Sequence, residues 1–482
     1  MLANQKIGDL PDRITQANDL EEADGRYVLA VLNRALRGED NAVLESAIAH
    51  ANARQLPLIV YTELLESVPY ASDRIFYFAL GAFRALAQSL AAQNIQCVQS
   101  LHKKDETSLL KSLISNAAVI YTDEDYTHWD RDKLSRLLHF AQQAVFSVDA
   151  ARLIPTRKLP KELKTTPAFR KAHSELRDHY AQLRKEVLDH RLTLENSTTI
   201  SLPTAPPTVQ NFANFSDDDL KSLIANCDIN HDIAISKEHP PTIVTLNQRI
   251  DTLKSDILAR YKWIRNNPAL EYSTSELSPY LHFGMVSPHH VLAEVEAAEV
   301  PKTYTWKFRD EFLTWREWSH YQAFYVPNLH EFEALPDSAK QTLLAHAEDE
   351  RPEARSPTDI RQGNTPDTTW NAAQREWLNT GWLHNNLRMY WAKQILRFTD
   401  SPQQAWKIAC ELNDTLSLDG RDPATYASMQ WAFGNAKPGY SEKDIYGWVA
   451  PKSDRAILKR KGMKEWIEER NHAPLGSIAF VT

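Results

Sequence analysis

Residues 27–148 decide the fold class, because short apolar runs alternate there with segments of helical pattern. The runs are YVLAVL (27–32), LIVY (58–61), IQCV (95–98), AVIY (118–121) and VFSV (145–148). The segments between them, such as the amphipathic stretch at 74–94, are long enough for crossover helices, which is typical of a parallel α/β sheet. We therefore predict a Rossmann-like α/β domain with a five-stranded parallel sheet over residues 1–155.

This part of the chain lacks the two short motifs that usually bind phosphate on such a sheet. No GxGxxG follows the first apolar run, and no GxxxxGK[ST] occurs anywhere in the sequence. Those motifs present backbone N–H groups to phosphate at a helix N-terminus, so an ordinary dinucleotide or triphosphate site is not predicted. The helix after the first run is expected to begin at Asp40 or Asn41, since both residue types cap helices well.

The composition is that of an ordinary globular chain. Of 482 residues, 43% are hydrophobic and 24% charged, and no run approaches the roughly 18 apolar residues of a membrane helix. Cys97, Cys227 and Cys410 lie far apart, which predicts neither a disulfide framework nor a zinc cluster. The polar, acidic start lacks the order of a secretion signal. We expect a cytoplasmic protein, nucleoid-associated in a bacterial cell.

The pattern changes after the fifth apolar run. Residues 152–171 hold seven Arg or Lys and a single acid, Glu162, whereas 195–210 and 236–241 are rich in Pro, Ser and Thr. Such segments are typical of connectors, so we predict an interdomain linker over 156–241 with one short helix starting near Ser216. From 242 to 482 every apolar pattern is helical. We therefore predict an all-helical second domain.

Large aromatic residues are unusually frequent in this second domain. The chain has 13 Trp against 13 Gly, and four of these tryptophans are Trp370, Trp377, Trp382 and Trp391. On helices, aromatic residues at this density either fill a core or line a pocket that can pass electrons, and both interpretations stay open. The net charge of −8 means that an anionic partner would have to bind a local basic patch.

Three polar motifs could carry chemistry, and each also has an ordinary structural interpretation. The hydroxyls of TSELSPYLHFG (274–284) could present oxygens to a phosphate or merely cap a helix. Glu317, within WREW (315–318), could form a surface ion pair or have a raised pKa in an aromatic pocket. Asp419 could belong to a simple turn or pair with Arg388 to fix the polar edge of a cofactor.

Five motifs occur in an order that resembles a known family. They are TSELSPYLHFG (274–284), WNAAQ (370–374), LRMYWAK (387–393), LND (412–414) and LDGRDP (418–423). The chain resembles the photolyase/cryptochrome family over nearly its whole length, and more narrowly the class II cyclobutane pyrimidine dimer photolyases. The resemblance implies an antenna-type α/β domain and a helical catalytic domain around FAD. It also implies a lyase that splits pyrimidine dimers in UV-damaged DNA by electron transfer from excited reduced FAD.

The resemblance also implies roles for individual residues. The FAD-binding positions would be Tyr261, Thr274, Ser275, Leu277, Ser278, Arg388, Asn413, Asp419 and Asp422. Asn413 would hydrogen-bond the reducible ring nitrogen of the flavin, and Glu317 would hydrogen-bond the carbonyls of the dimer. Met389 and Trp431 would form apolar walls around the flipped-out dimer.

The class II photolyases that this chain resembles have a relay of three tryptophans that passes electrons to the flavin, and this chain matches it only in part. Trp391 and Trp370 match its first two members, but the third position, seven residues after Trp391, is Phe398. Phenylalanine is far harder to oxidise than tryptophan. We therefore expect Trp377, Trp382 or a nearby tyrosine to end the relay, or the flavin to arrive already reduced.

A basic segment near the end of the chain predicts contacts with DNA phosphates, although a solvated terminal helix would show the same pattern. Its residues are Arg455, Lys459, Arg460 and Lys461. We expect a monomer that binds damaged DNA. An antenna chromophore, either deazaflavin or folate, is possible in the first domain, and another flavin or none stays open.

Three rival functions stay open at this point. A cryptochrome-like blue-light photoreceptor would keep FAD and the relay but signal to a protein. A (6-4) photolyase is disfavoured. The usual enzymes of that kind resemble this chain around His384, but they have a second histidine where this chain has Met389. A flavin-binding homologue without photochemistry is the third.

Overall fold

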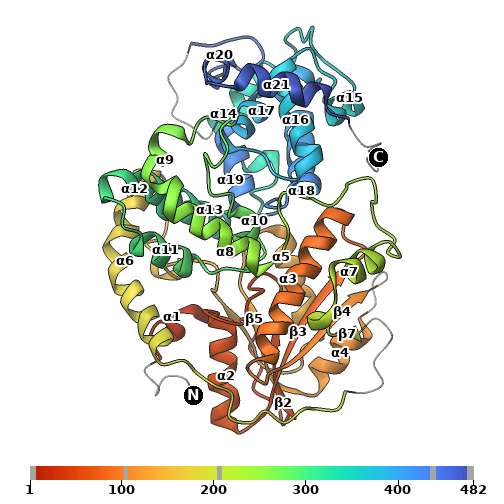
Figure 1. Cartoon of the computed structure of the whole chain (residues 1–482), viewed down its shortest axis with the longest axis vertical. Helices are drawn as coiled ribbons and strands as arrows, with labels where there is room; N and C mark the ends of the chain where they lie inside the picture. Colours follow the sequence, from red (N-terminus) through yellow and green to blue (C-terminus); the bar gives the residue numbers. More distant parts are fainter. Residues whose placement is uncertain (1–6, 103–106, 203–208, 435–440, 475–482) are drawn as a thin grey trace.

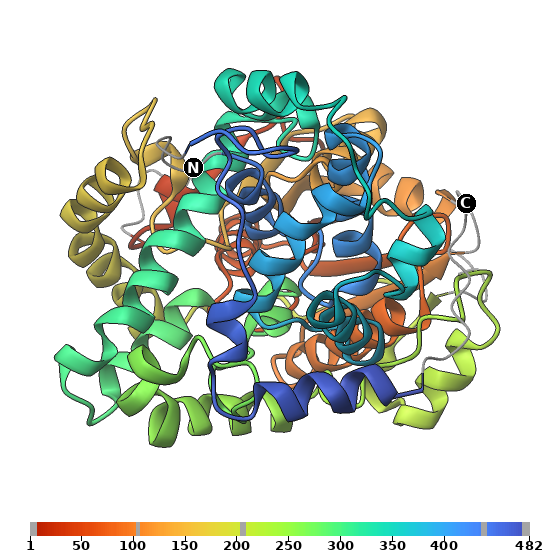
Figure 2. The ribbon, with the colours of Figure 1, turned by 90° about the horizontal axis from the view of Figure 1, so that it is seen from above.

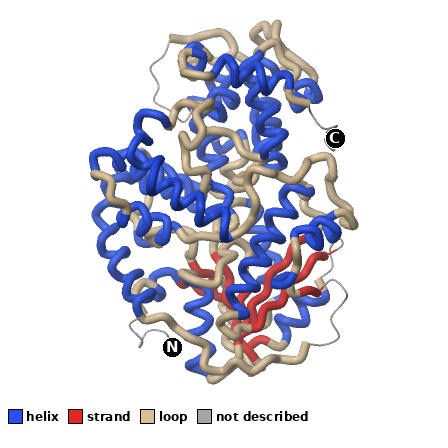
Figure 3. The backbone as a smooth tube through the Cα atoms, viewed as in Figure 1, coloured by secondary structure: helices blue, strands red, loops and turns tan. Residues whose placement is uncertain are grey.

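The computed structural model describes residues 7–102, 107–202, 209–434 and 441–474. One half of the molecule contains a β-sheet with flanking helices, and the other half is helical (Figures 1 and 3). All five predicted strands are present. The strands are β1 (Ile14–Gln16), β2 (Tyr27–Val31), β3 (Leu58–Leu65), β4 (Gln96–His102), β5 (Ala117–Asp123), β6 (Val145–Val148) and β7 (Val209–Gln210).

The sheet is larger than expected. Its order is β1-β6-β5-β2-β3-β4-β7. The strands β2 to β6 are parallel to one another, and the edge strands β1 and β7 pair antiparallel with β6 and β4. The prediction of a five-stranded parallel sheet is therefore corrected to a seven-stranded mixed sheet. Edge strands of three and two residues are too short to show an apolar period in the sequence. The parallel core has the doubly wound order of a Rossmann fold.

Helices cover both faces of this sheet because strand side chains alternate between the two sides. Val28 and Ala30 of β2 pack with α2 (Ala42–Arg54) and α3 (Asp73–Ala91). Leu29, on the opposite face, packs with α4 (Ser108–Ser115) and α5 (His128–Phe140). Asn41 caps α2 by accepting hydrogen bonds from two backbone N–H groups, which confirms the predicted start of that helix.

The loop after β2 explains why the sequence carries no glycine-rich phosphate motif. The backbone N–H groups of Asn33, Arg34 and Ala35 all donate to Oδ2 of Asp123, at 2.8, 3.0 and 3.1 Å. Asp123 is the last residue of β5, the neighbouring strand. A carboxylate of the protein thus occupies the N–H groups that a Rossmann fold usually offers to a phosphate.

The predicted linker contains more helix than expected. Helix α7 (Asp217–Ile224) begins with a capping box at Ser216, which confirms the predicted short helix. Helix α6 (Thr166–Asp189) was not predicted, although its apolar residues recur at helical spacing. Only five of its 24 residues are buried, and the basic composition of the preceding region favoured a connector. Residues 203–208 of the predicted connector lie outside the described part of the chain.

The remaining helices form the second half, where the structure assigns no strand to the residues that it describes beyond 242. They are α8 (Ile243–Thr252), η4 (Leu253–Ile257), α9 (Leu258–Ile264), α10 (Ser278–His282), α11 (Pro288–Ala297), α12 (Lys302–Asp310), η5 (Glu311–Arg316), α13 (Glu317–Tyr325), η6 (Phe332–Ala334), α14 (Asp337–Ala345), α15 (Pro357–Gln362), α16 (Thr368–Thr380), α17 (Asn385–Phe398), α18 (Pro402–Leu416), α19 (Pro423–Ala432), α20 (Arg455–Leu458) and α21 (Met463–His472). Helix α21 lies at the edge of this half and packs against α16 (Figure 2). None of the described helices has both the length and the apolar character to cross a bilayer.

One arginine from the sheet half fixes the helices that later prove to carry the site. Arg74 of α3 is 1% exposed, and its guanidinium donates to the carbonyls of Trp377 at 3.2 Å and Leu416 at 3.0 Å. These carbonyls lie near the C-termini of α16 and α18, where unpaired carbonyls favour a positive charge. Arg74 therefore sets the position of both helices relative to the sheet.

Candidate functional site

A buried ion pair lies at the centre of the helical half. Arg388, from α17, donates to Oδ1 of Asp419 at 2.9 Å and to the Ser417 hydroxyl at 3.2 Å. Burial alone would raise the pKa of Asp419, but Arg388 and the hydroxyl of Ser278 lower it below its ordinary value. The structure confirms the predicted pairing of Arg388 with Asp419 and shows that the carboxylate stays ionised.

The TSELSPYLHFG segment reaches the same place. Ser278, the first residue of α10, interacts with Asp419 and accepts a hydrogen bond from Nε1 of Trp382 at 3.2 Å. No side chain caps α10. The segment therefore does not use its hydroxyls as an ordinary helix cap, and the alternative interpretation as a ligand-binding segment gains support.

Three of the predicted site residues carry a buried polar atom that finds no hydrogen-bond partner among the described residues, as do several residues elsewhere in the molecule. The three atoms are Oγ1 of Thr274, Nε of Arg388 and Oδ1 of Asn413. Asn413 is fully buried on α18, and its amide nitrogen is bound to the carbonyl of Ala409 at 2.8 Å. An unpaired buried polar atom costs about 1–3 kcal/mol, so a set of them on the predicted site residues fits a polar ligand. The donors and acceptors suit the polar edge and phosphates of a flavin dinucleotide.

Stacked tryptophans adjoin this cluster. The rings of Trp391 and Trp370 lie 5.4 Å apart between centroids at an interplanar angle of 13°, as a relay would require. Trp377 is perpendicular to Trp391 at 5.2 Å, and the guanidinium of Arg388 lies 5.2 Å from the centre of its ring. All three tryptophans are fully buried. The aromatic residues thus both fill the core and continue directly from the candidate ligand site.

The structure corrects the role expected for Glu317. Its side chain is 3% exposed, with one oxygen accepting from the backbone N–H of Leu153 at 3.1 Å and the other from Arg316 at 2.7 Å. Burial would raise its pKa, but the nearby His173 and Arg316 lower the pKa to about 2. Helix α6 and the loop at Leu153 cover this carboxylate. Glu317 therefore joins the two halves in this structure, and its contacts argue against the predicted hydrogen bonds to a pyrimidine dimer.

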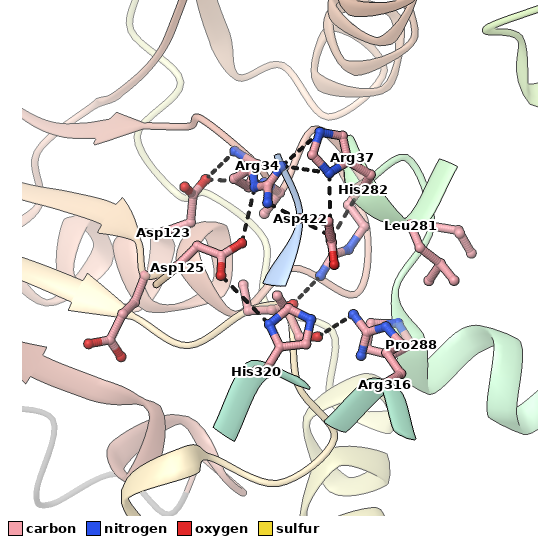
Figure 4. Close-up of a pocket in the computed structure, with 16 residues that line it drawn as sticks. Arg34, Arg37, Asp123, Asp125, Leu281, His282, Pro288, Arg316, His320 and Asp422 are labelled. Carbon is pink, nitrogen blue, oxygen red and sulfur yellow. Dashed lines mark hydrogen bonds and ion pairs between the residues drawn. The ribbon is translucent and has the colours of Figure 1, made fainter. Parts of the chain in front are cut away.

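Asp422 also lies elsewhere than expected. It caps α19 by accepting from the N–H of Ala424 at 2.9 Å, and its other oxygen faces His282 at 3.3 Å and Arg34 at 3.8 Å (Figure 4). This network also includes Asp125, which pairs with Arg34 at 3.0 Å. The cavity inside it measures about 20 Å³, room for a water molecule and not for a cofactor. The expectation that Asp422 binds a cofactor is corrected to a role in joining the domains.

An accessible carboxylate that the sequence argument missed is Glu311. It lies on η5 between Arg265 at 2.8 Å and Lys307 at 2.9 Å, and its side chain is 28% exposed. Trp315, four residues later on the same segment, is exposed as well. The sequence offered one signal for Glu311: it lies four residues before Trp315, a spacing that brings two side chains close together on a helix.

The structure gives the surroundings of three further predicted residues. Trp431 of α19 is 38% exposed with the ammonium of Lys393 5.3 Å from its ring, and Met389 is half-buried on α17. Tyr261 of α9 is buried against Phe308. Burial raises the pKa of Tyr261 above its ordinary value, which keeps the phenol neutral.

Two positions of the 274–278 segment complete the predicted set. Leu277 is buried in the core, and Ser275 is half-buried.

The basic segment lies next to the site-forming loop. Arg455, Lys459 and Lys461 are exposed, and Arg460 is half-buried. The amide of Asn267 donates to the backbone carbonyl of Lys461 at 3.0 Å, which holds this segment against the chain that leads to Thr274. The predicted phosphate-binding residues therefore lie at the surface, close to the chain segment that precedes Thr274.

Comparisons with known proteins agree with this arrangement. A deoxyribodipyrimidine photo-lyase of Methanothermobacter thermautotrophicus is 29% identical to this chain over 461 residues, covering 95% of this chain and 97% of that protein. One of Potorous tridactylus is 40% identical over 188 residues, covering 38% of this chain and 35% of that protein. No protein-family model matches the chain.

Solved structures show the same fold. A bacterial class III photolyase from Agrobacterium tumefaciens superimposes with a TM-score of 0.62 over 96% of this chain and 90% of that chain, at 19% identity. The topology agrees with the doubly wound sheet and helical half described above. With its motifs gathered around Arg388 and Asp419, the chain is therefore similar over 95% of its length to a deoxyribodipyrimidine photo-lyase, and it shares the fold of a solved photolyase structure.

Proposed function

We propose that the protein is a deoxyribodipyrimidine photo-lyase that repairs cyclobutane pyrimidine dimers in UV-damaged DNA in the light. The observation that carries this proposal is the buried Arg388–Asp419 pair, which leaves Nε of Arg388 unpaired and adjoins the stacked Trp391 and Trp370. The relatives named above as deoxyribodipyrimidine photo-lyases support the reaction.

FAD is the ligand that these residues fit. Thr274, Ser275 and Ser278 would hold its phosphates, and Arg388 with Asp419 would hold the polar edge of its ring system. Asn413 would direct its unpaired Oδ1 at the ring, because the protein leaves that acceptor free. When bound and reduced, FAD supplies a light-excited electron donor. The protein would contribute buried polar groups to this ring, since Asn413 is fully buried and Arg388 is 8% exposed.

DNA would enter over the exposed aromatic residues at the margin of this site. Trp431 and Met389 supply apolar surface for an extruded base pair lesion, and Glu311 supplies an accessible carboxylate. Arg455, Lys459, Arg460 and Lys461 would bind phosphates without regard to sequence. A protein with net charge −8 needs such a local basic segment to bind DNA.

Several narrower assignments belong to the same proposal. We place the antenna-type domain at 1–155, the linker at 156–241 and the catalytic domain at 242–482, and we assign the chain to the class II branch. We expect a monomer in the cytoplasm, associated with the nucleoid in a bacterial cell. A cavity of about 60 Å³ beyond the carboxyl ends of β2 and β3, lined by Tyr70 and Trp129, marks where an antenna chromophore would be sought.

The test is repair of a defined lesion. The purified protein, with its flavin chemically reduced, is mixed with an oligonucleotide that carries a single cyclobutane thymine dimer and illuminated with blue light. We expect the dimer to disappear in the light and to persist in the dark. Persistence of the dimer in the light, with reduced flavin confirmed by its spectrum, would contradict repair and favour a cryptochrome-like photoreceptor. A (6-4) lesion in a parallel sample should stay intact.

A further inference from the structure

The tryptophan relay of this chain stops inside the protein. Trp370, its second member, is fully buried, and the ring 5.4 Å beyond it in a perpendicular orientation belongs to Phe398. Phe398 is itself fully buried and carries no heteroatom that could stabilise a positive charge. An oxidised Trp370 therefore needs another partner if the charge is to be retained long enough for the flavin to stay reduced.

A tyrosine with its own base lies beside this stopping point. The hydroxyl of Tyr390, on α17, donates a hydrogen bond to Oδ2 of Asp367. The other carboxylate oxygen, Oδ1, accepts the backbone N–H of Trp370 at 2.9 Å, because Asp367 caps α16. One carboxylate thus bridges the hydroxyl of Tyr390 and the backbone N–H of Trp370, which holds the tyrosine close to the helix that carries Trp370.

The surroundings of Tyr390 suit proton-coupled oxidation. Its side chain is 2% exposed, and burial raises its pKa well above the ordinary value, so the phenol is neutral before oxidation. A phenol loses its proton readily once an electron has been removed, and a hydrogen-bonded base in place lowers the barrier. Asp367 is 11% exposed, so the proton arrives at a group near the surface.

We propose that Tyr390 is the terminal electron donor of the relay and that Asp367 is the base that accepts its proton. This inference rests on the proposed function. In the step, Trp391 gives an electron to the photoexcited flavin, Trp370 re-reduces Trp391, and Tyr390 re-reduces Trp370. The phenol proton of Tyr390 moves to Oδ2 of Asp367. The products are a neutral tyrosyl radical and a protonated carboxyl. An external thiolate returns them to the resting state by donating one electron to the radical, and the proton on Asp367 moves back to the phenolate oxygen, leaving a thiyl radical outside the protein.

The other candidates have less suitable surroundings. Trp377 contacts Trp391, but the guanidinium of Arg388 over its ring opposes a second positive charge, and its Nε1 has no partner to accept a proton. Tyr446 is also buried near α17, but its hydroxyl donates to the backbone carbonyl of Lys393 at 3.1 Å. A carbonyl cannot take the proton. Tyr446 therefore provides a matched control.

The test follows radicals after a blue flash on the protein loaded with oxidised flavin, by transient absorption and electron paramagnetic resonance. We expect a tyrosyl radical in the wild type and in Tyr446→Phe. In Tyr390→Phe only a tryptophan radical should form and decay faster. Asp367→Asn keeps the helix cap through its one carbonyl oxygen and places an NH₂ donor against the Tyr390 hydroxyl in place of the base, so tyrosyl formation should slow by roughly 100-fold.

Two results would overturn the proposal: a tyrosyl radical that survives Tyr390→Phe, or a wild type in which only tryptophan radicals appear. Unchanged tyrosyl formation in Asp367→Asn would overturn the part played by Asp367. Failure here is separable from failure of the proposed function, because repair by the wild type with chemically reduced flavin does not use the relay.

Discussion

Two buried polar clusters, both built around an arginine and an aspartate, differ in how completely the central arginine is paired. In the cluster between the domains, Arg34 contacts Asp125, His282 and Asp422 and donates to the carbonyl of Arg421 (Figure 4). In the cluster of the helical half, Arg388 pairs with Asp419 but leaves Nε unpaired. Thr274 and Asn413 likewise retain free oxygens.

The difference separates a joint from a binding site. Unpaired buried atoms are stabilised when a ligand supplies partners, and Nε of Arg388 is such an atom, whereas the donors of Arg34 are matched within the protein. The joint is not fully paired, because Nη2 of Arg421 and Nε2 of His320 also lack partners among the described residues. The neutral state of His282 agrees with the pairing of Arg34, since burial and Arg34 lower its pKa to about 3. The predictions below break one cluster and leave the other intact.

The largest effect on stability is expected at the joint. Arg34→Met leaves Asp125 and Asp422 buried without their cation, so the free energy of unfolding should fall by about 3–5 kcal/mol. Arg170→Ala, which removes an exposed pair with Asp310, should cost less than about 1 kcal/mol. Denaturant titration of the two variants measures both values, and equal losses would contradict the assigned difference in burial.

A smaller effect should appear with pH at Glu317. Its pKa in the folded protein is about 2 against an ordinary 4.5, so its contribution to stability is complete above pH 5 and is lost as the pH falls toward 2. Glu317→Gln should therefore differ most from the wild type near neutrality, by about 1–3 kcal/mol, and converge with it in acid. Unfolding curves at several pH values test this. Loss of dimer repair in folded Glu317→Gln would restore the substrate role that we have rejected.

Thr274 offers a sharper contrast between the flavin-free and flavin-bound states. Thr274→Val removes an unpaired hydroxyl at constant shape, so the flavin-free protein should be as stable as before or more so. Flavin binding should weaken by about 1 kcal/mol, or roughly fivefold. Thr415→Val, at a hydroxyl already bound to the carbonyl of Glu411, should leave flavin affinity unchanged. Equal flavin affinities for wild type and Thr274→Val would place the phosphates elsewhere.

The smallest effect concerns DNA. Lys459→Ala combined with Lys461→Ala should weaken binding to damaged and undamaged duplexes alike, and should reduce the slope of log affinity against log salt by about 2. Lys185→Ala, an exposed lysine on α6, is the control. Fluorescence anisotropy at three salt concentrations gives the slopes. An unchanged slope would remove these lysines from the DNA interface.

Much of the fold follows from local pattern. Five apolar runs sufficed for the parallel core, and Ser216 and Asn41 marked helix starts correctly. The two short edge strands escaped prediction because they are held by pairing, which leaves no periodic apolar signal in a single sequence. Helix α6 was missed although its apolar residues recur at helical spacing, because the basic composition of the preceding region is typical of a connector.

The sequence predicted the site correctly where residues of the motifs contact one another. It failed where segments far away in the sequence bury a motif residue. Arg388 and Asp419 were expected to pair, and they do. The motif around Glu317 gave an equally clear prediction. Its carboxylate is nevertheless covered by Leu153 and His173, which lie more than 140 residues away in the sequence. Only the folded chain shows that Glu311 is the carboxylate left accessible.

The most direct measurement of the central claim is the flavin content of two arginine variants per mole of folded protein. Absorption spectra of purified wild type, Arg34→Met and Arg388→Met, normalised to folded protein by circular dichroism, give this quantity. The account predicts flavin in the wild type and in Arg34→Met, and its loss from Arg388→Met. Flavin retained by Arg388→Met, or a wild type that takes up no flavin on reconstitution, would contradict it.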